Sequence, residues 1–98
     1  DWGQVLALYD QLLAVTPTPV VALNRAVALA EVAGPEAALA VVDGLPLEAY
    51  HPFHATRADL LRRLGRRSDA VAAYQRALEL ATNPAERAFL ERRCAQVS

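Results

Sequence analysis

The chain has 98 residues, of which 54% are hydrophobic and 21% are charged, and its formal net charge is −1. These values fit one globular domain and exclude an intrinsically disordered chain. The longest apolar stretch, residues 19–33, is interrupted by Asn24, Arg25 and Glu31, so we expect no membrane-spanning segment. The charges are uneven, because the first half holds six acidic residues and one Arg, whereas the second half holds five acidic residues and nine Arg.

The first predicted helix extends from Asp1, whose side chain can cap it, to about residue 15. Its apolar residues recur at the three- and four-residue spacing of one helix face, namely Val5, Leu8, Leu12 and Val15. We interpret residues 1–17 as the second helix of an incomplete repeat, in a chain that opens without Met and is a piece of a longer protein. The apolar face is then expected to be bare, and it could receive the rest of the parent protein or pair two copies as a dimer.

Residues 18–45 are predicted to form a repeat of two helices. Thr18 can cap the first helix, residues 19–33, whose apolar face is made by Val20, Leu23, Val27 and Ala30. The second helix, residues 36–43, is nearly all Ala, Val and Leu. We therefore expect this second helix to be buried on more than one side.

A second repeat of two helices is predicted over residues 53–82, with Gly65 as the turn between them. Ser68 is placed to cap the second helix of this repeat. Residues 83–98 are predicted to form a last, capping helix with its charged residues on a wetter face. Its two large apolar residues are expected to point inward, namely Phe89 and Leu90.

Small and bulky apolar residues recur at fixed offsets in these segments. In the second repeat, offsets of twelve, four and three residues connect Ala58, Ala70, Tyr74 and Ala77. The same offsets connect Ala26, Ala38, Val42 and Leu45, and offsets of four and three connect Val5, Tyr9 and Leu12. This pattern resembles the tetratricopeptide repeat (TPR), a helical hairpin of about 34 residues whose helices approach closely at small side chains. We predict an all-α fold, a single TPR-like domain over residues 1–98 with about six antiparallel helices in a right-handed solenoid.

No catalytic, cofactor or metal site is predicted. His51 and His54 have a spacing that two metal ligands can use, but no third ligand is placed nearby, and Pro52 should keep His51 outside the helix. The sequence has no Gly-rich phosphate loop and no Gly-x-Ser-x-Gly motif. The single cysteine, Cys94, excludes an intrachain disulfide and favours a reducing compartment such as the cytoplasm, and we interpret it as a packing residue. An enzyme would need a catalytic domain elsewhere in a longer chain.

Five arginines in one stretch raise the question of nucleic-acid binding, namely Arg57, Arg62, Arg63, Arg66 and Arg67. Acidic side chains are interspersed among them, and no aromatic or amide residues that could read bases accompany them. We interpret the stretch as a solvated helix end whose cations face the carboxyl-terminal dipole, with a patch facing a protein or a phosphate as the alternative.

TPR stacks commonly bind partners on the concave surface made by the first helix of each pair. The polar residues that we expect on this surface are Asn24, Glu31, Thr56, Asp59 and Arg63. Their role in partner binding is a hypothesis, and Asn24 is alternatively an interhelical residue with satisfied hydrogen bonds. The chain has no Lys, which disfavours the carboxylate clamp by which some TPR proteins capture a peptide carboxyl terminus.

Three segments carry a more specific resemblance, namely residues 8–10 (LYD), 19–28 (PVVALNRAVA) and 57–66 (RADLLRRLGR). Through them, and over nearly its whole length, the chain is similar to the carboxyl-terminal TPR-like domain of bacterial extracytoplasmic-function (ECF) RNA polymerase sigma factors. The resemblance implies a regulatory module that modulates transcription initiation by contacting the sigma core domains, RNA polymerase or a signalling protein, and that binds no DNA sequence by itself. The alternative is a generic TPR adaptor that binds a peptide of an unrelated partner.

Overall fold

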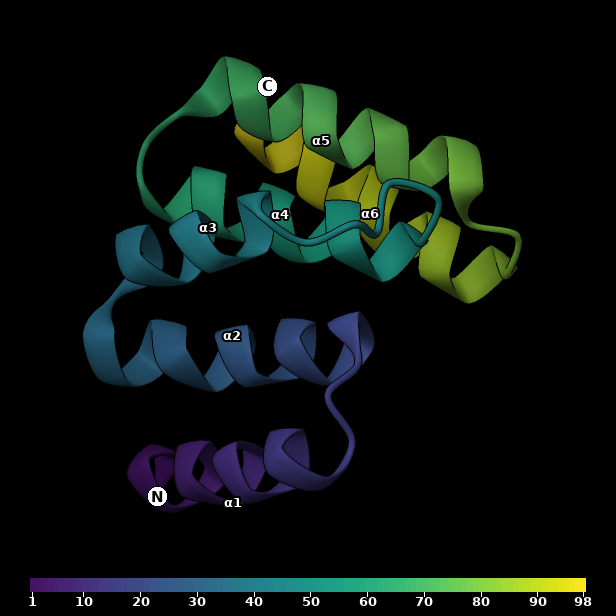
Figure 1. The fold of residues 1–98 in the computed structure, drawn as a ribbon. Helices are drawn as coiled ribbons and strands as arrows, with labels where there is room; N and C mark the ends of the chain where they lie inside the picture. Colours follow the sequence, from purple (N-terminus) through teal and green to yellow (C-terminus); the bar gives the residue numbers. More distant parts are fainter. The chain divides into compact units, whose positions relative to one another are not determined.

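The computed structural model describes all of residues 1–98 and contains six α-helices and no strand (Figure 1). The helices are α1 (Trp2–Val15), α2 (Pro19–Ala33), α3 (Pro35–Asp43), α4 (His51–Arg63), α5 (Arg67–Leu80) and α6 (Pro84–Val97). They form two compact units, Asp1–Leu47 with α1 to α3 and Glu48–Ser98 with α4 to α6. The predicted all-α fold of TPR-like helical repeats is confirmed.

Side-chain caps set the beginnings of three helices. The side-chain oxygens of Asp1, Thr18 and Asn83 accept hydrogen bonds from backbone N–H groups in the first turns of α1, α2 and α6, at 2.8, 3.3 and 2.9 Å respectively. Each cap satisfies a donor that the helix itself leaves without a partner. These three helix starts therefore follow from short stretches of sequence.

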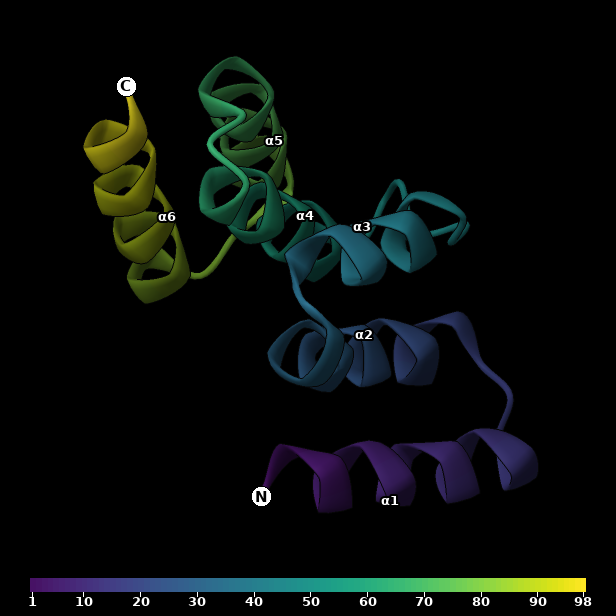
Figure 2. The ribbon, with the colours of Figure 1, turned by 90° about the vertical axis from the view of Figure 1, so that its left-hand side faces the viewer.

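In the first unit, α2 packs between α1 and α3, as both views of the ribbon show (Figures 1 and 2). Arg25 of α2 and Asp10 of α1 form an ion pair, with 2.6 Å between Nε and Oδ1. The buried residues of this unit lie on α2 and α3, namely Leu23, Ala26, Ala28, Ala30, Ala38, Leu39 and Val42, whereas α1 has none. Helix α1 is therefore the least buried helix of this unit.

In the second unit, α5 packs between α4 and α6 (Figure 2). The turn from α4 to α5 depends on Gly65, whose φ of 76° lies in the left-handed region that residues with a side chain rarely adopt. Around it, the N–H of Gly65 bonds to the carbonyl of Arg62, and the N–H of Arg66 bonds to that of Leu61. This pair of bonds is the Schellman motif, which satisfies carbonyls at the end of α4.

The alanine spacing predicted from the sequence forms the interior. Ala58 of α4 and Ala70 and Ala77 of α5 are fully buried, and Tyr74 is 1% exposed. Small side chains let the two helix backbones approach closely, and Tyr74 fills the space that the alanines leave. The recurring offsets in the sequence therefore mark the residues at which α4 and α5 pack against each other.

Two predicted helix boundaries in the second unit are wrong. Ser68 does not cap α5, because the helix begins at Arg67, with Arg66 in the cap position and no side-chain cap bond. His51 is not outside α4 but is its first residue. Pro52 is compatible with this start, since the N–H groups of a first helical turn have no partner within the helix and a missing one costs nothing.

Two predictions about buried faces are also wrong. Helix α3 is buried on one side only, since Leu39 is buried whereas Ala37 and Ala40 are exposed. Exposing a methyl group costs little, so an alanine-rich helix need not be surrounded. Phe89 is 47% exposed rather than inward, and the guanidinium carbon of Arg93 lies 5.4 Å from the centroid of its ring, a cation–π arrangement that covers part of the ring.

Candidate partner-binding surface

The candidate residues Asn24 and Glu31 lie on an exposed face of α2. Val20 and Val27 lie on the same face, because they are four residues before and three residues after Asn24, and they are 36% and 42% exposed. The sequence pattern predicts an apolar face of Val20, Leu23, Val27 and Ala30. Of these four residues Leu23 and Ala30 are buried, together with Ala26, whereas the two valines are not. The surface formed by Val20, Asn24, Val27 and Glu31, called the α2 stripe below, combines apolar and polar side chains.

A composition of this kind suits a protein interface, where apolar area supplies binding energy and a few polar groups fix orientation. The two valines are the residues that the sequence interpretation missed at this site. Their spacing to Asn24 and Glu31 was visible in the sequence, but the choice of face depended on the positions of α1 and α3.

The remaining candidates, Thr56, Asp59 and Arg63, occupy the matching register of α4. Each lies 32 residues after Asn24, Val27 and Glu31 respectively, at the repeat distance that separates Ala26 from Ala58. Thr56 is half-buried. The Asp59 carboxylate pairs with Arg63 at 3.9 Å and accepts a hydrogen bond from Arg62 Nη2 at 2.5 Å. Asp59 is thus already neutralised by arginines of its own helix.

A polar network joins this part of α4 to the core of the second unit. The hydrogen bond from Arg62 to Asp59 is the main cause that raises the pKa of Arg62, and an interaction with the Tyr74 hydroxyl acts in the same direction. Burial raises the pKa of Tyr74, while the nearby Arg62 lowers it by a smaller amount. Arg62 therefore connects the surface of α4 to the buried hydroxyl of α5, a role that the interpretation as a solvated helix end missed.

The histidines serve local contacts in the second unit. His54 Nε2 lies 2.7 Å from the carbonyl oxygen of Glu48, and the ring packs edge-on against Phe53 with 4.9 Å between centroids. His51 Nδ1 lies 3.7 Å from a carboxylate oxygen of Glu86. No group of three or more His, Cys, Asp or Glu side chains is arranged to hold a metal ion.

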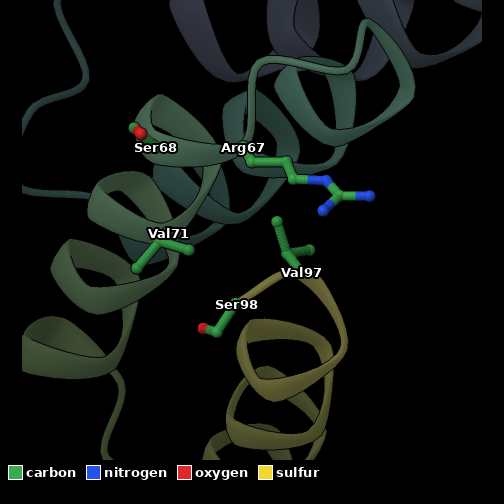
Figure 3. Close-up of a pocket in the computed structure, with 5 residues that line it drawn as sticks. All are labelled: Arg67, Ser68, Val71, Val97 and Ser98. Atoms are coloured by element: carbon green, nitrogen blue, oxygen red, sulfur yellow. The ribbon is translucent and has the colours of Figure 1, made fainter.

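An open pocket of about 450 Å³ lies between α5 and α6 (Figure 3). Arg67, Ser68 and Val71 line it from α5, and Val97 and Ser98 line it from α6 and the residue that follows it. The lining contains two hydroxyls and one guanidinium but no carboxylate side chain, imidazole or thiol. It therefore offers no side-chain base beside Ser68 that could activate a nucleophile.

A second groove, of about 360 Å³, lies on α1 and is lined by Val5, Leu8, Tyr9 and Leu12. Its lining is almost entirely apolar. Leu8 is 64% exposed, and Val15, one turn beyond the groove, is 82% exposed. Of the apolar face expected to be bare, Leu8, Leu12 and Val15 are therefore exposed, whereas Val5 is half-buried.

Comparison with known proteins agrees with the helical architecture. Residues 51–84 match the family model described as tetratricopeptide repeat, over α4, α5 and the connection to α6. A tetratricopeptide repeat indicates a protein–protein interaction module. None of the six helices is both long enough and apolar enough to cross a membrane.

The chain is also similar to an uncharacterized protein of Rhizobium meliloti (strain 1021), with 47% identity over 92 residues. The similarity covers 92% of this chain and 22% of that relative, so the chain spans about a fifth of the relative's length. No solved structure matches the chain.

Proposed function

We propose that this chain is the protein-interaction module of a bacterial ECF RNA polymerase sigma factor and modulates transcription initiation in the cytoplasm. The interaction role rests on the tetratricopeptide repeat of residues 51–84. The sigma-factor assignment rests on the resemblance of residues 8–10, 19–28 and 57–66 to the carboxyl-terminal domain of that group. The longer relative is compatible with a module attached to further domains. In this proposal the chain contacts the sigma core domains, RNA polymerase or a signalling protein, and it has no catalytic role, cofactor or sequence-specific DNA contact of its own.

The α2 stripe is the proposed contact surface of the first unit. Burying Val20 and Val27 against a partner would remove apolar area from water, worth roughly 1.5 kcal/mol for a fully buried valine. Asn24 lies between these two valines in the α2 stripe. Its side chain can donate hydrogen bonds to the partner and accept them from it, which would fix the partner's orientation. In the second unit, Thr56, Asp59 and Arg63 are the proposed contacts, with Arg63 best suited to a carboxylate of the partner.

A binding assay with matched valine variants tests this proposal. The sigma core domains and RNA polymerase would be passed over the immobilised chain, and we expect retention of at least one of them. Val27→Asp should weaken that retention by about tenfold or more, because it places a charge in the apolar part of the interface. Val32→Asp is the control, since Val32 lies on the same helix, is 52% exposed and is outside the α2 stripe. Retention of neither protein would exclude the sigma core domains and RNA polymerase as partners, and equal effects of the two variants would contradict the α2 stripe as the contact surface.

A generic adaptor is the second candidate function, because the tetratricopeptide repeat itself indicates a protein partner without specifying transcription. In that case the chain would bind a peptide of an unrelated protein through the same stripe. The upstream coding sequence separates the two candidates. A sigma factor requires helical, basic DNA-binding regions there, whereas an adaptor would show further repeats. A dimer formed through α1 is a third arrangement, and the oligomeric state of the chain in solution tests it.

A further inference from the structure

A shallow groove of about 290 Å³ lies on α6 in the second unit. Four side chains at helical spacing line it, namely Phe89, Arg92, Arg93 and Gln96. Helix α6 packs on α5 along the side of Leu90, which is 1% exposed, whereas Phe89 is 47% exposed. This groove, called the α6 groove below, is therefore open to solvent.

The α6 groove is positively charged and its lining contains no carboxylate. Arginines elsewhere in this unit pair with an acidic residue of their own helix, as Arg66 does with Asp69 at 2.9 Å. Arg92 and Arg93 form no such ion pair. Both guanidinium groups are therefore available to a carboxylate from outside the chain.

The acidic residues of α6 do not neutralise this groove. Glu91 follows Phe89 by two residues and so lies about 200° around the helix from it, on the opposite side. Glu86 precedes Phe89 by three residues, but its carboxylate oxygen lies 3.7 Å from His51 Nδ1. The charge of the two arginines is therefore directed to solvent.

Phe89 adds an apolar contact to this charged groove. The guanidinium carbon of Arg93 lies 5.4 Å from the centroid of its ring. Stacking of this kind orients the planar guanidinium, so less side-chain entropy is lost when it binds a carboxylate. The groove thus combines an oriented cation, a second cation and an exposed aromatic ring.

The register of α6 disfavours an apolar helix as the occupant of the groove. Arg92 and Arg93 lie 32 residues after Leu60 and Leu61 of α4, which are 2% and 0% exposed. Where α4 buries two leucines, α6 therefore carries two cations. An apolar helix covering them would remove both charges from water without supplying a partner, which is unfavourable.

We propose that the α6 groove binds an acidic segment of a protein partner, in which carboxylates flank an apolar side chain. The carboxylates pair with the guanidinium groups of Arg92 and Arg93, and the apolar side chain packs on the exposed part of the Phe89 ring. Gln96 can donate and accept hydrogen bonds with the peptide backbone. This contact is separate from the α2 stripe, and it does not depend on whether the parent protein is a sigma factor.

A nucleic acid fits the α6 groove less well than an acidic peptide. Affinity for nucleic acids comes largely from many phosphate contacts, whereas two cations line this groove and the chain has a net charge of −1. The volume of about 290 Å³ also lies at the lower limit of pockets that enclose a small molecule. The groove suits a few side chains of a peptide that crosses the helix.

Fluorescence anisotropy with a defined peptide tests this proposal. The probe is a fluorescein-labelled peptide of Asp and Glu residues around one Leu, and the control peptide has Asn and Gln in their place. Arg92→Gln and Phe89→Ala should each weaken binding of the acidic peptide by about fivefold or more. Arg76→Gln is the matched control, because it removes the same charge from an exposed arginine outside the groove, and it should change the affinity by less than about twofold. Circular dichroism would establish that each variant keeps its helices.

Two further measurements locate the peptide. In an amide NMR titration, the signals of α6 around Phe89 and Arg92 should shift most. Val27→Asp, which alters the α2 stripe, should leave binding of the acidic peptide unchanged, so failure of the two proposed surfaces can be told apart.

Each other outcome would overturn the proposal. Absence of binding at about 1 mM acidic peptide, or equal binding of the neutral peptide, would mean that the groove does not select carboxylates. Equal weakening by Arg92→Gln and Arg76→Gln would show a response to overall charge alone. Amide shifts confined to residues outside α6 would place the peptide on another surface. Tighter binding of a single-stranded oligonucleotide, lost in Arg92→Gln, would identify a nucleic acid as the occupant.

Discussion

Arg62 Nη2 donates a hydrogen bond of 2.5 Å to Asp59 Oδ1. The two residues are three positions apart, so this ion pair lies within one turn of α4. Both side chains are about one-third exposed, at 32% for Arg62 and 39% for Asp59. The ion pair alone is therefore screened by solvent and contributes little. Arg62 matters because it also interacts with the hydroxyl of Tyr74, which is buried in α5.

Replacing Arg62 by Met should reduce the free energy of unfolding by about 1 kcal/mol, because the Tyr74 hydroxyl loses a polar neighbour while the apolar stem is kept. Arg76→Met is the matched control, since the ion pair of Arg76 with Glu79 is more exposed and should contribute less than about 0.5 kcal/mol. Urea unfolding followed by circular dichroism measures both values. Equal effects of the two variants would show that the contact of Arg62 with Tyr74 does not stabilise the fold.

Ionisation of the Tyr74 hydroxyl should lower the free energy of unfolding in alkaline solution. Its pKa is raised from 10.0 in the folded protein, because burial disfavours the phenolate. Its contribution to stability is therefore complete below the unfolded-state pKa of 10.0 and is lost as the pH rises through the higher folded-state pKa. Tyr74→Phe removes this titration, so its urea midpoint should fall less than that of the wild type between about pH 9 and pH 11. Parallel losses in the two proteins would contradict this assignment.

The local elements of this fold could be predicted from the sequence. Helix ends were predictable where a side chain caps the helix within three residues, as at Asp1, Thr18 and Asn83, because such a signal is contained in a short stretch. The burial of Ala58 and Ala70 was also predictable, since the spacing repeats along the chain and close packing requires small side chains.

The choice between two possible faces of one helix could not be predicted. Val27 and Ala30 both fit an apolar face of α2, and only the positions of α1 and α3 leave Val27 exposed. Phe89 and Leu90 are adjacent in the sequence, but α6 packs on α5 along the side of Leu90. The sequence therefore predicts that Asn24 and Glu31 belong to the candidate site, but it does not predict that Val20 and Val27 do.

Close approach of α4 and α5 at alanines predicts a large effect of overpacking. Ala58→Leu should reduce the free energy of unfolding by about 1–3 kcal/mol, since Ala58 is fully buried and three additional carbon atoms must displace packed neighbours. Ala72→Leu is the control, because Ala72 is an exposed residue of α5 and should tolerate the change within about 0.5 kcal/mol. Thermal and urea unfolding would measure both variants. A neutral Ala58→Leu variant would mean that the two helices do not depend on a small residue at this position.

The turn between α4 and α5 depends on the conformation of one glycine. Gly65→Ala should cost about 1–2 kcal/mol, because the φ of 76° is unfavourable for a residue with a Cβ atom. A Cβ atom there would meet no atom within 4 Å, so the loss would come from the backbone and not from a clash. Gly44→Ala is the matched control, since Gly44 ends α3 with a φ of −90° and the nearest atom to a new Cβ is 3.6 Å away. Urea unfolding should show a lower midpoint for Gly65→Ala and an unchanged or higher midpoint for Gly44→Ala, because alanine also restricts the unfolded chain. The reverse order would mean that the left-handed conformation at residue 65 does not set the geometry of this hairpin.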